Sequence, residues 1–371
     1  MTGVLVLVTG TGRSGTSTIA GSLHHLGLHV PGPYLGANES NPKGFFESTW
    51  AVKFHKRITA AAGIHDFDSR PGALDRARES VTPRMKASLV EFLRRHSVAG
   101  PQLVVKDPRS VWVQQLWKDA AREAELEIRF LSMLRHPAEV VGSRTTYYAT
   151  KSDEDQRRRY ETFNVARWVN NSLISERETR GDVRTFVPYS DLLDDWRPVL
   201  ARVADELGLT FDSDLTAGSH HPVDDFIDPG LRRHTVSWDD IEVPDALREV
   251  AQEVWDVQMV LCGHAGADAA ASERLDAAAE RYEQILAEAA AVSHDTTGEI
   301  RDEARRAGAR EAREQAGKAG GRQGSPSGLG PGSGSDRALR DVNGRELVRE
   351  VGKRAARRLR RPSPRKHGEG A

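Results

Sequence analysis

Short apolar runs alternate with longer segments of helical periodicity along about the first 264 residues of the chain. The short runs are typical of strands that are buried on both faces, whereas the longer segments place apolar residues three and four positions apart. The sequence predicts strands at residues 4–8, 103–106, 128–134 and 185–187. It predicts helices at residues 16–26, 50–61, 83–94, 111–123, 138–145, 160–179, 196–207 and 244–261. This alternation indicates an α/β, three-layer fold with a mostly parallel central sheet flanked by helices.

The pattern changes near Gly263. Residues 267–314 are rich in Ala, Glu and Arg, and residues 317–335 are rich in Gly, Ser and Pro. Residues 343–361 carry many basic side chains around one apolar face. The alanine-rich segment has an apolar stripe with a spacing of four and three, which predicts a helix that packs on the first domain or on a partner helix. The stripe consists of Leu275, Ala279, Tyr282, Leu286 and Ala289.

These changes predict four parts of the chain. Residues 1–264 form an α/β domain with a phosphate-binding loop, and residues 265–316 form a helical extension. Residues 317–342 are a linker, and residues 343–371 are a basic, amphipathic tail. The linker and the tail lack the apolar content to fold, so we expect both to be disordered. A short basic amphipathic tail binds weakly either to an anionic membrane or to a protein, or it is simply solvated.

Composition narrows the class of partner and the compartment. The chain has 53 basic and 54 acidic side chains and a net charge of −1, so its overall field does not favour nucleic acid. Its single cysteine, Cys262, allows no internal disulfide and fits a reducing environment. No apolar stretch is long enough to span a bilayer, and the N-terminus does not read as a signal peptide. We therefore expect a cytoplasmic protein.

The strongest chemical signal is the turn between the first strand and the first helix. It reads Thr9-Gly10-Thr11-Gly12-Arg13-Ser14-Gly15-Thr16-Ser17. Glycines let the backbone approach an anion closely, and the N-terminus of the helix adds partial positive charge. Gly10 and Gly15 have the spacing of a Walker A loop, but Thr16 stands where that motif has its lysine. The turn therefore predicts a phosphate-binding loop whose cation is Arg13.

A second phosphate site is predicted after residues 128–134. This strand runs into Arg135-His136-Pro137, and Ser143 follows about two helical turns later. Arginine offers a planar fork of donors to a phosphate, and the serine hydroxyl adds another donor. The carboxyl ends of parallel strands meet at one edge of a sheet, so the glycine-rich turn, residues 106–109 and Arg135 are expected to form one site.

Together, the two segments resemble those of sulfotransferases that use 3′-phosphoadenylyl sulfate (PAPS), in particular bacterial members with a Gly-Arg-Ser-Gly-Thr loop. The resemblance covers roughly residues 4–261. It implies PAPS as co-substrate, adenosine 3′,5′-bisphosphate as product and no metal. It implies that Arg135 and Ser143 bind the 3′-phosphate. It also implies that the 5′-phosphosulfate is bound by Gly12, Arg13, Ser14, Gly15, Thr16 and Ser17.

The sequence departs from the family pattern at the base that deprotonates the acceptor. Many members place a histidine two residues after the lysine that ends the second strand, but Pro108 stands two residues after Lys106 here. A carboxylate is the alternative. Lys106 is expected at the leaving phosphate or the transferring sulfuryl group. The candidate bases, in order, are Glu47 in the presumed acceptor-side segment 41–47, then Asp107, then His55.

The predicted activity is in-line transfer of a sulfuryl group from PAPS to a hydroxyl or amine of a saccharide, glycolipid or secondary metabolite. The first alternative is a small-molecule kinase of the phosphate-loop class. The missing Walker lysine and the pair of Arg135 and Ser143 argue against it. The second alternative is a non-catalytic nucleotide-binding scaffold that acts through its basic tail. The oligomeric state is not predicted by the sequence.

Overall fold

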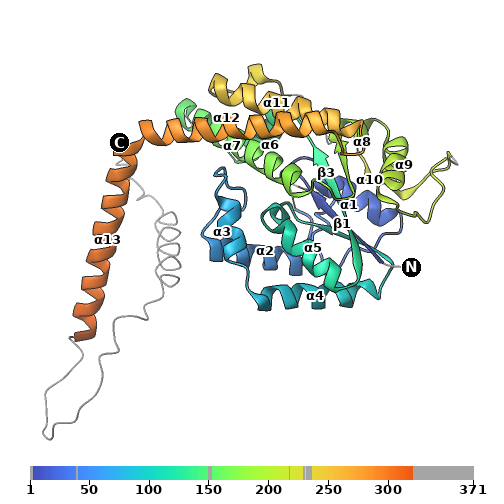
Figure 1. The fold of residues 1–371 in the computed structure, drawn as a ribbon, viewed down its shortest axis with the longest axis horizontal. Coiled ribbons are helices and arrows are strands. Elements are labelled where there is room, and N and C mark those ends of the chain that lie inside the picture. Colours follow the sequence, from blue (N-terminus) through green and yellow to red (C-terminus); the bar gives the residue numbers. More distant parts are fainter. Residues whose placement is uncertain are drawn as a thin grey trace, which may run out of the picture. The chain divides into compact units, whose positions relative to one another are not determined.

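A computed structural model of the chain describes residues 3–38, 41–148, 153–216, 218–228, 230 and 236–320 (Figure 1). Its sheet has the strand order β2-β1-β3-β4, and every pair of neighbouring strands is parallel. The strands are β1 Gly3–Thr9, β2 Gln102–Lys106, β3 Leu126–Leu134 and β4 Arg184–Pro188. All four predicted strands and the predicted fold class are thus confirmed.

Most helices that cover the sheet lie close to their predicted ranges, but the one predicted at residues 160–179 begins at residue 154. The long ones are α1 Thr16–His25, α2 Thr49–Ala62, α4 Pro83–Ser97, α5 Gln114–Glu123, α6 Pro137–Tyr148, α7 Glu154–Glu178, α9 Trp196–Leu207 and α11 Asp245–Cys262. The predicted helix 111–123 is divided into a 3₁₀ turn, η1 Pro108–Val113, and α5. Three short helices were not predicted, because five to seven residues are too few to show an apolar stripe. They are α3 Ala73–Glu79, α8 Tyr189–Asp194 and α10 Pro222–Phe226.

Both faces of the sheet are buried, as expected for a parallel sheet between two layers of helices. On β1, Leu5 and Leu7 point into a core that includes residues of α2, α3, α4 and α5. Val6 and Val8 point into the opposite core with residues of α1, α8, α9 and α10. The alternation along one strand therefore fixes which helices cover which face, and it leaves the carboxyl ends of the strands as the open edge.

A third core joins α6, α7 and α11 to α12 Ala269–Val292. Leu275 and Tyr282 of the predicted stripe are buried, whereas Ala289 is exposed. The Tyr282 hydroxyl donates to the backbone carbonyl of Ser69 at 2.6 Å or of Ala166 at 2.9 Å. Helix α12 therefore packs on the first domain, which is one of the two alternatives that the sequence predicted.

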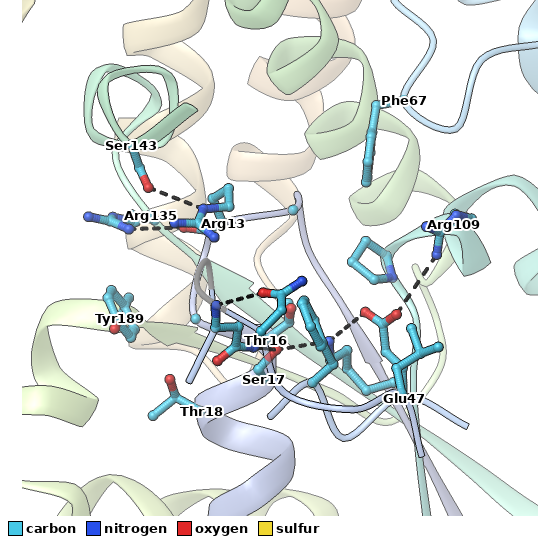
Figure 2. Close-up of a pocket in the computed structure, with 18 of the residues that line it drawn as sticks. Arg13, Thr16, Ser17, Thr18, Glu47, Phe67, Arg109, Arg135, Ser143 and Tyr189 are labelled. Atoms are coloured by element: carbon cyan, nitrogen blue, oxygen red, sulfur yellow. Dashed lines mark hydrogen bonds and ion pairs between the residues drawn. The ribbon is translucent and has the colours of Figure 1, made fainter. Parts of the chain in front are cut away.

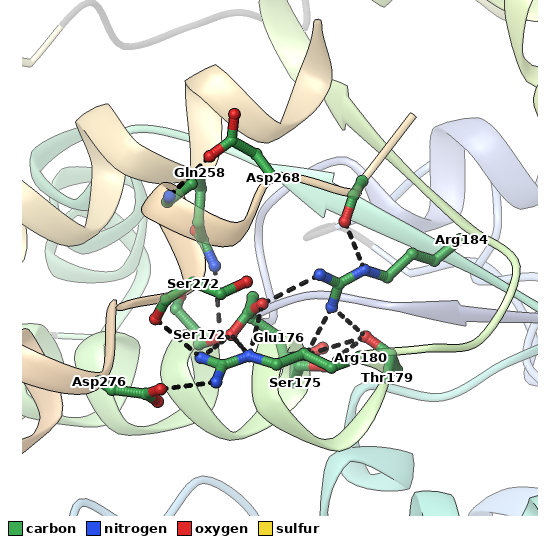
Figure 3. Close-up of polar contacts among 12 residues, drawn as sticks. Ser172, Ser175, Glu176, Thr179, Arg180, Arg184, Gln258, Asp268, Ser272 and Asp276 are labelled. Carbon is green, nitrogen blue, oxygen red and sulfur yellow. Dashed lines mark hydrogen bonds and ion pairs between the residues drawn. The ribbon is translucent and has the colours of Figure 1, made fainter. Parts of the chain in front are cut away.

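Buried charges reinforce this attachment (Figure 3). Glu176 of α7 is fully buried and accepts hydrogen bonds from Arg180 and Arg184. Arg180 also donates to Asp276 of α12 at 2.7 Å, and Arg184 donates to the carbonyl of Gly266 at 2.8 Å. The network thus joins α7 and β4 to the residues that lead into and form α12.

The chain divides into two compact units, residues 1–297 and residues 298–371. Of the second unit, the structure describes residues 298–320, which belong to α13 His294–Gly320. Residues 317–320 of the predicted linker belong to α13, whereas residues 321–342 and the predicted tail, residues 343–371, lie outside the described residues. The predicted boundary at residue 264 remains a prediction. No helix in the described part of the chain has an apolar stretch long enough to cross a membrane.

Candidate functional site

A cavity of about 390 Å³ opens where β1, β2 and β3 end. Its walls come from the glycine-rich turn, the segment before α2, the ends of β2 and β3, and the start of α8. The lining residues are Gly12, Arg13, Gly15, Thr16, Ser17, Thr18, Leu35, Asn38, Asn41, Pro42, Phe45, Glu47, Phe67, Lys106, Pro108, Arg109, Arg135, Ser143 and Tyr189. The structure therefore brings together the predicted phosphate-binding segments and Glu47.

The glycine-rich turn is shaped by left-handed backbone at Gly15, which has a φ of 83° and caps α1. A Cβ atom on Gly15 would lie 2.1 Å from a ring carbon of Tyr189, so only glycine fits there. Glycine has no side-chain oxygen that could cap the helix. The partial positive charge of the α1 N-terminus therefore remains available to a ligand in the cavity. Ser14 is buried away from it, with its hydroxyl 2.6 Å from that of Thr11.

One end of the cavity gathers Arg13, Arg135 and Ser143 (Figure 2). Arg13 Nε donates to Ser143 Oγ at 3.2 Å. Arg135 Nη1 donates to the Arg13 carbonyl at 3.0 Å, and its Nε donates to Glu139 at 2.9 Å. The Arg135 guanidinium also lies 5.1 Å from the centre of the Tyr189 ring. Two guanidinium groups and a hydroxyl in this arrangement suit a multiply charged anion.

The other end holds a buried ion pair (Figure 2). Lys106 Nζ donates to Glu47 Oε1 at 2.7 Å and to Ser17 Oγ at 3.0 Å. Burial lowers the pKa of Lys106, and the Glu47 carboxylate opposes that shift. An ammonium group thus reaches the first turn of α1 from β2, although Thr16 stands where a Walker A loop has its lysine. Arg109 Nη1 lies 4.0 Å from Glu47 Oε2.

Asp107 and His55, the other two candidate bases, do not line the cavity. Both are buried, and His55 Nδ1 lies 2.8 Å from Asp107 Oδ2. The Trp117 indole donates to His55 Nε2 at 2.9 Å, so the imidazole proton is on Nδ1, which donates to Asp107. Burial raises the pKa of a carboxyl group, but the donors of His55 and Arg109 outweigh this and lower the pKa of Asp107 to about 2.

The cavity also holds residues from outside the segments predicted for the site, namely Thr18, Leu35, Asn38, Phe67 and Tyr189. Tyr189 directly follows β4, and the rule that ligands bind beyond the carboxyl ends of strands would have indicated it. Arg109 was expected in the site as part of residues 106–109, but its contact with Asp66 was not predicted. Phe67 lies between α2 and α3, where no sequence pattern indicates a site. Among the described residues, no group of three or more His, Cys, Asp or Glu side chains is placed to hold a metal ion.

Comparison with known proteins identifies the family. The family model described as "Sulfotransferase family" matches residues 6–213, which is more than half of the chain. The chain therefore belongs to the sulfotransferase family, which confirms the resemblance. The narrower assignment to bacterial members with a Gly-Arg-Ser-Gly-Thr loop stays a prediction. A search of the curated proteins found no match.

Solved structures of sulfotransferases are similar at low identity. The sulfotransferase domain from the Synechococcus PCC 7002 olefin synthase is 18% identical, with a TM-score of 0.37, and the match covers 68% of this chain and 93% of that one. The sulfotransferase domain from the curacin biosynthetic pathway is 16% identical, with a TM-score of 0.35 and coverage of 69% and 97%. A sulfotransferase from Mycobacterium tuberculosis H37Rv is 16% identical, with a TM-score of 0.32 and coverage of 63% and 76%.

Proposed function

We propose that the chain transfers a sulfuryl group from PAPS to a hydroxyl or amine of a small-molecule or glycan acceptor. The observation that carries the proposal is the buried pair of Lys106 and Glu47 at the first turn of α1, in the same cavity as Arg13, Arg135 and Ser143. This cavity offers cations for a donor with two phosphate groups, and a carboxylate for the acceptor. Cytoplasmic location and the absence of a nucleic-acid partner remain predictions from composition.

The residues suit the charges of PAPS. In the proposal, Arg135 and Ser143 bind the 3′-phosphate, since both are buried at one end of the cavity. The backbone of residues 12–17 and Arg13 bind the 5′-phosphosulfate, because the turn combines a guanidinium group with the N-terminus of α1. Ser14 would contribute through its backbone, since its hydroxyl is paired with that of Thr11.

With a hydroxyl acceptor, the transfer exchanges one sulfur–oxygen bond for another. The acceptor oxygen attacks sulfur while the bond from sulfur to the leaving phosphate oxygen breaks, so negative charge grows on that phosphate. In the proposal, Arg13 and Lys106 stabilise this charge, which is supported by the presence of both side chains in the cavity lining. Glu47 takes the acceptor proton as general base. Lys106 occupies Oε1 of Glu47, whereas among the described residues no group donates a hydrogen bond to Oε2, so Oε2 is the atom that receives the proton.

The acceptor would enter beside Glu47. The walls there are mostly apolar, with the two amides of Asn38 and Asn41 among them. Such walls fit a hydroxylated molecule with an apolar face, which includes a saccharide, a glycolipid and many secondary metabolites. The apolar lining residues are Leu35, Pro42, Phe45, Phe67 and Pro108.

The variant Glu47→Gln tests the role of the base. We expect it to retain affinity for adenosine 3′,5′-bisphosphate within about threefold and to lose roughly a hundredfold or more in transfer, because glutamine cannot accept the proton. Calorimetry gives the affinity, and mass analysis of products from labelled PAPS and an extract of the source cells gives the transfer. Glu161→Gln is the control, because Glu161 is buried and paired with Arg157 but does not line the cavity.

The same assay separates the alternatives. Full activity in Glu47→Gln would exclude Glu47 as the base and leave Asp107 to be tested. Loss of activity when Mg²⁺ is chelated, with ATP as donor, would indicate a kinase instead. Tight binding of the bisphosphate without any sulfated product would favour the nucleotide-binding scaffold.

A further inference from the structure

Arg109 lies among three carboxylates, a feature that the proposed mechanism does not use. Its Nε donates to Asp66 Oδ2 at 2.8 Å, and its Nη1 donates to Asp107 Oδ1 at 2.7 Å. The same Nη1 stops 4.0 Å from Glu47 Oε2, which is too far for a hydrogen bond (Figure 2). Arg109 is therefore hydrogen-bonded to two carboxylates and is held about 1 Å short of the third.

The position of Asp107 is rigidly determined. The side chain is fully buried, and Oδ1 also accepts the backbone N–H of Arg109 at 3.0 Å, which caps η1. Its other oxygen accepts from His55, whose tautomer is fixed by Trp117. Because donors flank both oxygens, the carboxylate cannot turn without losing a buried hydrogen bond.

The gap between Arg109 and Glu47 matters for proton transfer. Lys106 already donates to Glu47 Oε1. A second donor on Oε2 would occupy the remaining oxygen, and a carboxylate that accepts hydrogen bonds on both oxygens holds its charge more firmly and is a weaker base. Arg109 needs to move by only about 1 Å to become that second donor.

We propose that Asp107 is a positioning residue: together with Asp66, it holds the Arg109 guanidinium off Glu47 and so keeps Oε2 open to the acceptor. The inference rests on the proposed function, because it takes Glu47 as the base. It gives Asp107 a role in the same reaction without contact with the donor or the acceptor.

The variant Asp107→Asn breaks the arrangement in a defined way. Asparagine offers one acceptor oxygen to two flanking donors, so its amide nitrogen must face either His55 or Arg109. The variant also removes the charge that attracts the guanidinium. In a crystal structure of Asp107→Asn, we expect Arg109 Nη1 to lie about 2.9 Å from Glu47 Oε2. A separation that remains at the present 4.0 Å would overturn the proposal, whether or not the enzyme transfers sulfuryl groups.

Kinetics provide a second, independent test. The assay measures sulfuryl transfer from labelled PAPS to water and to a panel of simple alcohols and phenols. Asp107→Asn should lower kcat at least tenfold and leave the KM for PAPS and the Kd for the bisphosphate within about twofold, since the donor contacts are intact. Adding Arg109→Gln should raise kcat again, because the guanidinium that blocks Oε2 is gone. A double variant that is no faster than Asp107→Asn contradicts the proposal.

Two further variants keep the test decisive. If Asp107→Asn does not fold, Asp66→Asn takes its place, because Asp66 is partly exposed and contacts the same guanidinium. It should lower kcat several-fold, again with recovery on adding Arg109→Gln; unchanged kcat overturns the proposal. Glu176→Gln is the control for a lost buried ion pair: it should lower the melting temperature and leave kcat unchanged. Failure of the proposed function would appear differently, as no transfer by the wild-type protein to any acceptor.

Discussion

Arg135 shows how one side chain can serve both the fold and the site. Two of its nitrogens donate to Glu139 and to the Arg13 carbonyl, and it lines the cavity beside Ser143. We expect Arg135→Ala to weaken binding of adenosine 3′,5′-bisphosphate by about 2–4 kcal/mol, the size of one or two charge-assisted hydrogen bonds. The loss for AMP should be clearly smaller, because AMP lacks the 3′-phosphate. Calorimetry with both nucleotides measures the difference.

The comparison of two ligands is needed because Arg135 also supports the backbone at Arg13. A change in that backbone would weaken the binding of both nucleotides equally. Equal losses would therefore contradict the assignment of Arg135 to the 3′-phosphate. Ser143→Ala provides a milder change at the same place. It should weaken the bisphosphate alone, by about 1 kcal/mol.

Single residues were predictable where they stand at the ends of apolar strands. Arg135 and Lys106 follow this rule, and the structure brings both to the cavity. The contact of Arg109 with Asp66 was not predictable, because Asp66 lies in a segment without periodicity and meets Arg109 only through tertiary packing. Asp107 stands at a strand end as well, yet its side chain faces away from the cavity, toward His55.

At the scale of elements, the turn from β1 to α1 depends on Gly15. We expect Gly15→Ala to lower both the melting temperature and the affinity for the bisphosphate. A left-handed backbone costs a residue with a Cβ atom about 1–2 kcal/mol, and the contact with Tyr189 adds to this. Thermal unfolding and calorimetry test both effects.

Gly72→Ala is the matched control, because Gly72 has a φ of −64° and a Cβ atom there would meet no atom within 4 Å. It should change stability by less than about 0.5 kcal/mol. If Gly15→Ala behaves like this control, the turn tolerates a side chain, and the argument for a close fit with Tyr189 is wrong.

Among the described α-helices, those of ten residues or more were predicted and those of five to seven residues were not. Helix α9 was predicted to the residue, since its twelve residues carry a full apolar stripe. Helix α10 has five residues and begins with Pro222 after a His221 cap, which is too little pattern to recognise. Such short helices depend on tertiary contacts, here the packing of Val223 in the core with α1 and α9.

At the scale of the whole molecule, periodicity predicted that residues 267–314 are helical but did not predict the surface that they cover. A stripe of Leu275 and Tyr282 suits any apolar partner. What decides between the domain and another chain is specific: the carbonyls of Ser69 and Ala166 lie within reach of the Tyr282 hydroxyl, and Arg180 lies within reach of Asp276. Ser69, Ala166 and Arg180 all lie far from α12 in the sequence, so single-sequence patterns cannot reveal these contacts.

Two truncations therefore locate the end of the folded unit. A chain of residues 1–297 should keep the melting temperature and the bisphosphate affinity of the full-length protein, because it retains the whole first compact unit. A chain of residues 1–264 should be strongly destabilised. It loses four buried side chains of α12 (Ala271, Leu275, Ala278 and Tyr282), of which Leu275 alone contributes about 1.5–3 kcal/mol. It also leaves Arg184 without the Gly266 carbonyl and Arg180 without Asp276.

Thermal unfolding of both truncations, with Tyr282→Phe in the full-length protein, separates these contributions. Tyr282→Phe removes only the hydroxyl and should cost about 1–2 kcal/mol, since the ring stays buried. Equal melting temperatures for residues 1–264 and for the full-length protein would show that α12 is dispensable and that the predicted boundary at residue 264 is right. A loss of stability in 1–264 but not in 1–297 would place the end of the sulfotransferase domain after α12, because the buried face of that helix completes the core around α7 and α11.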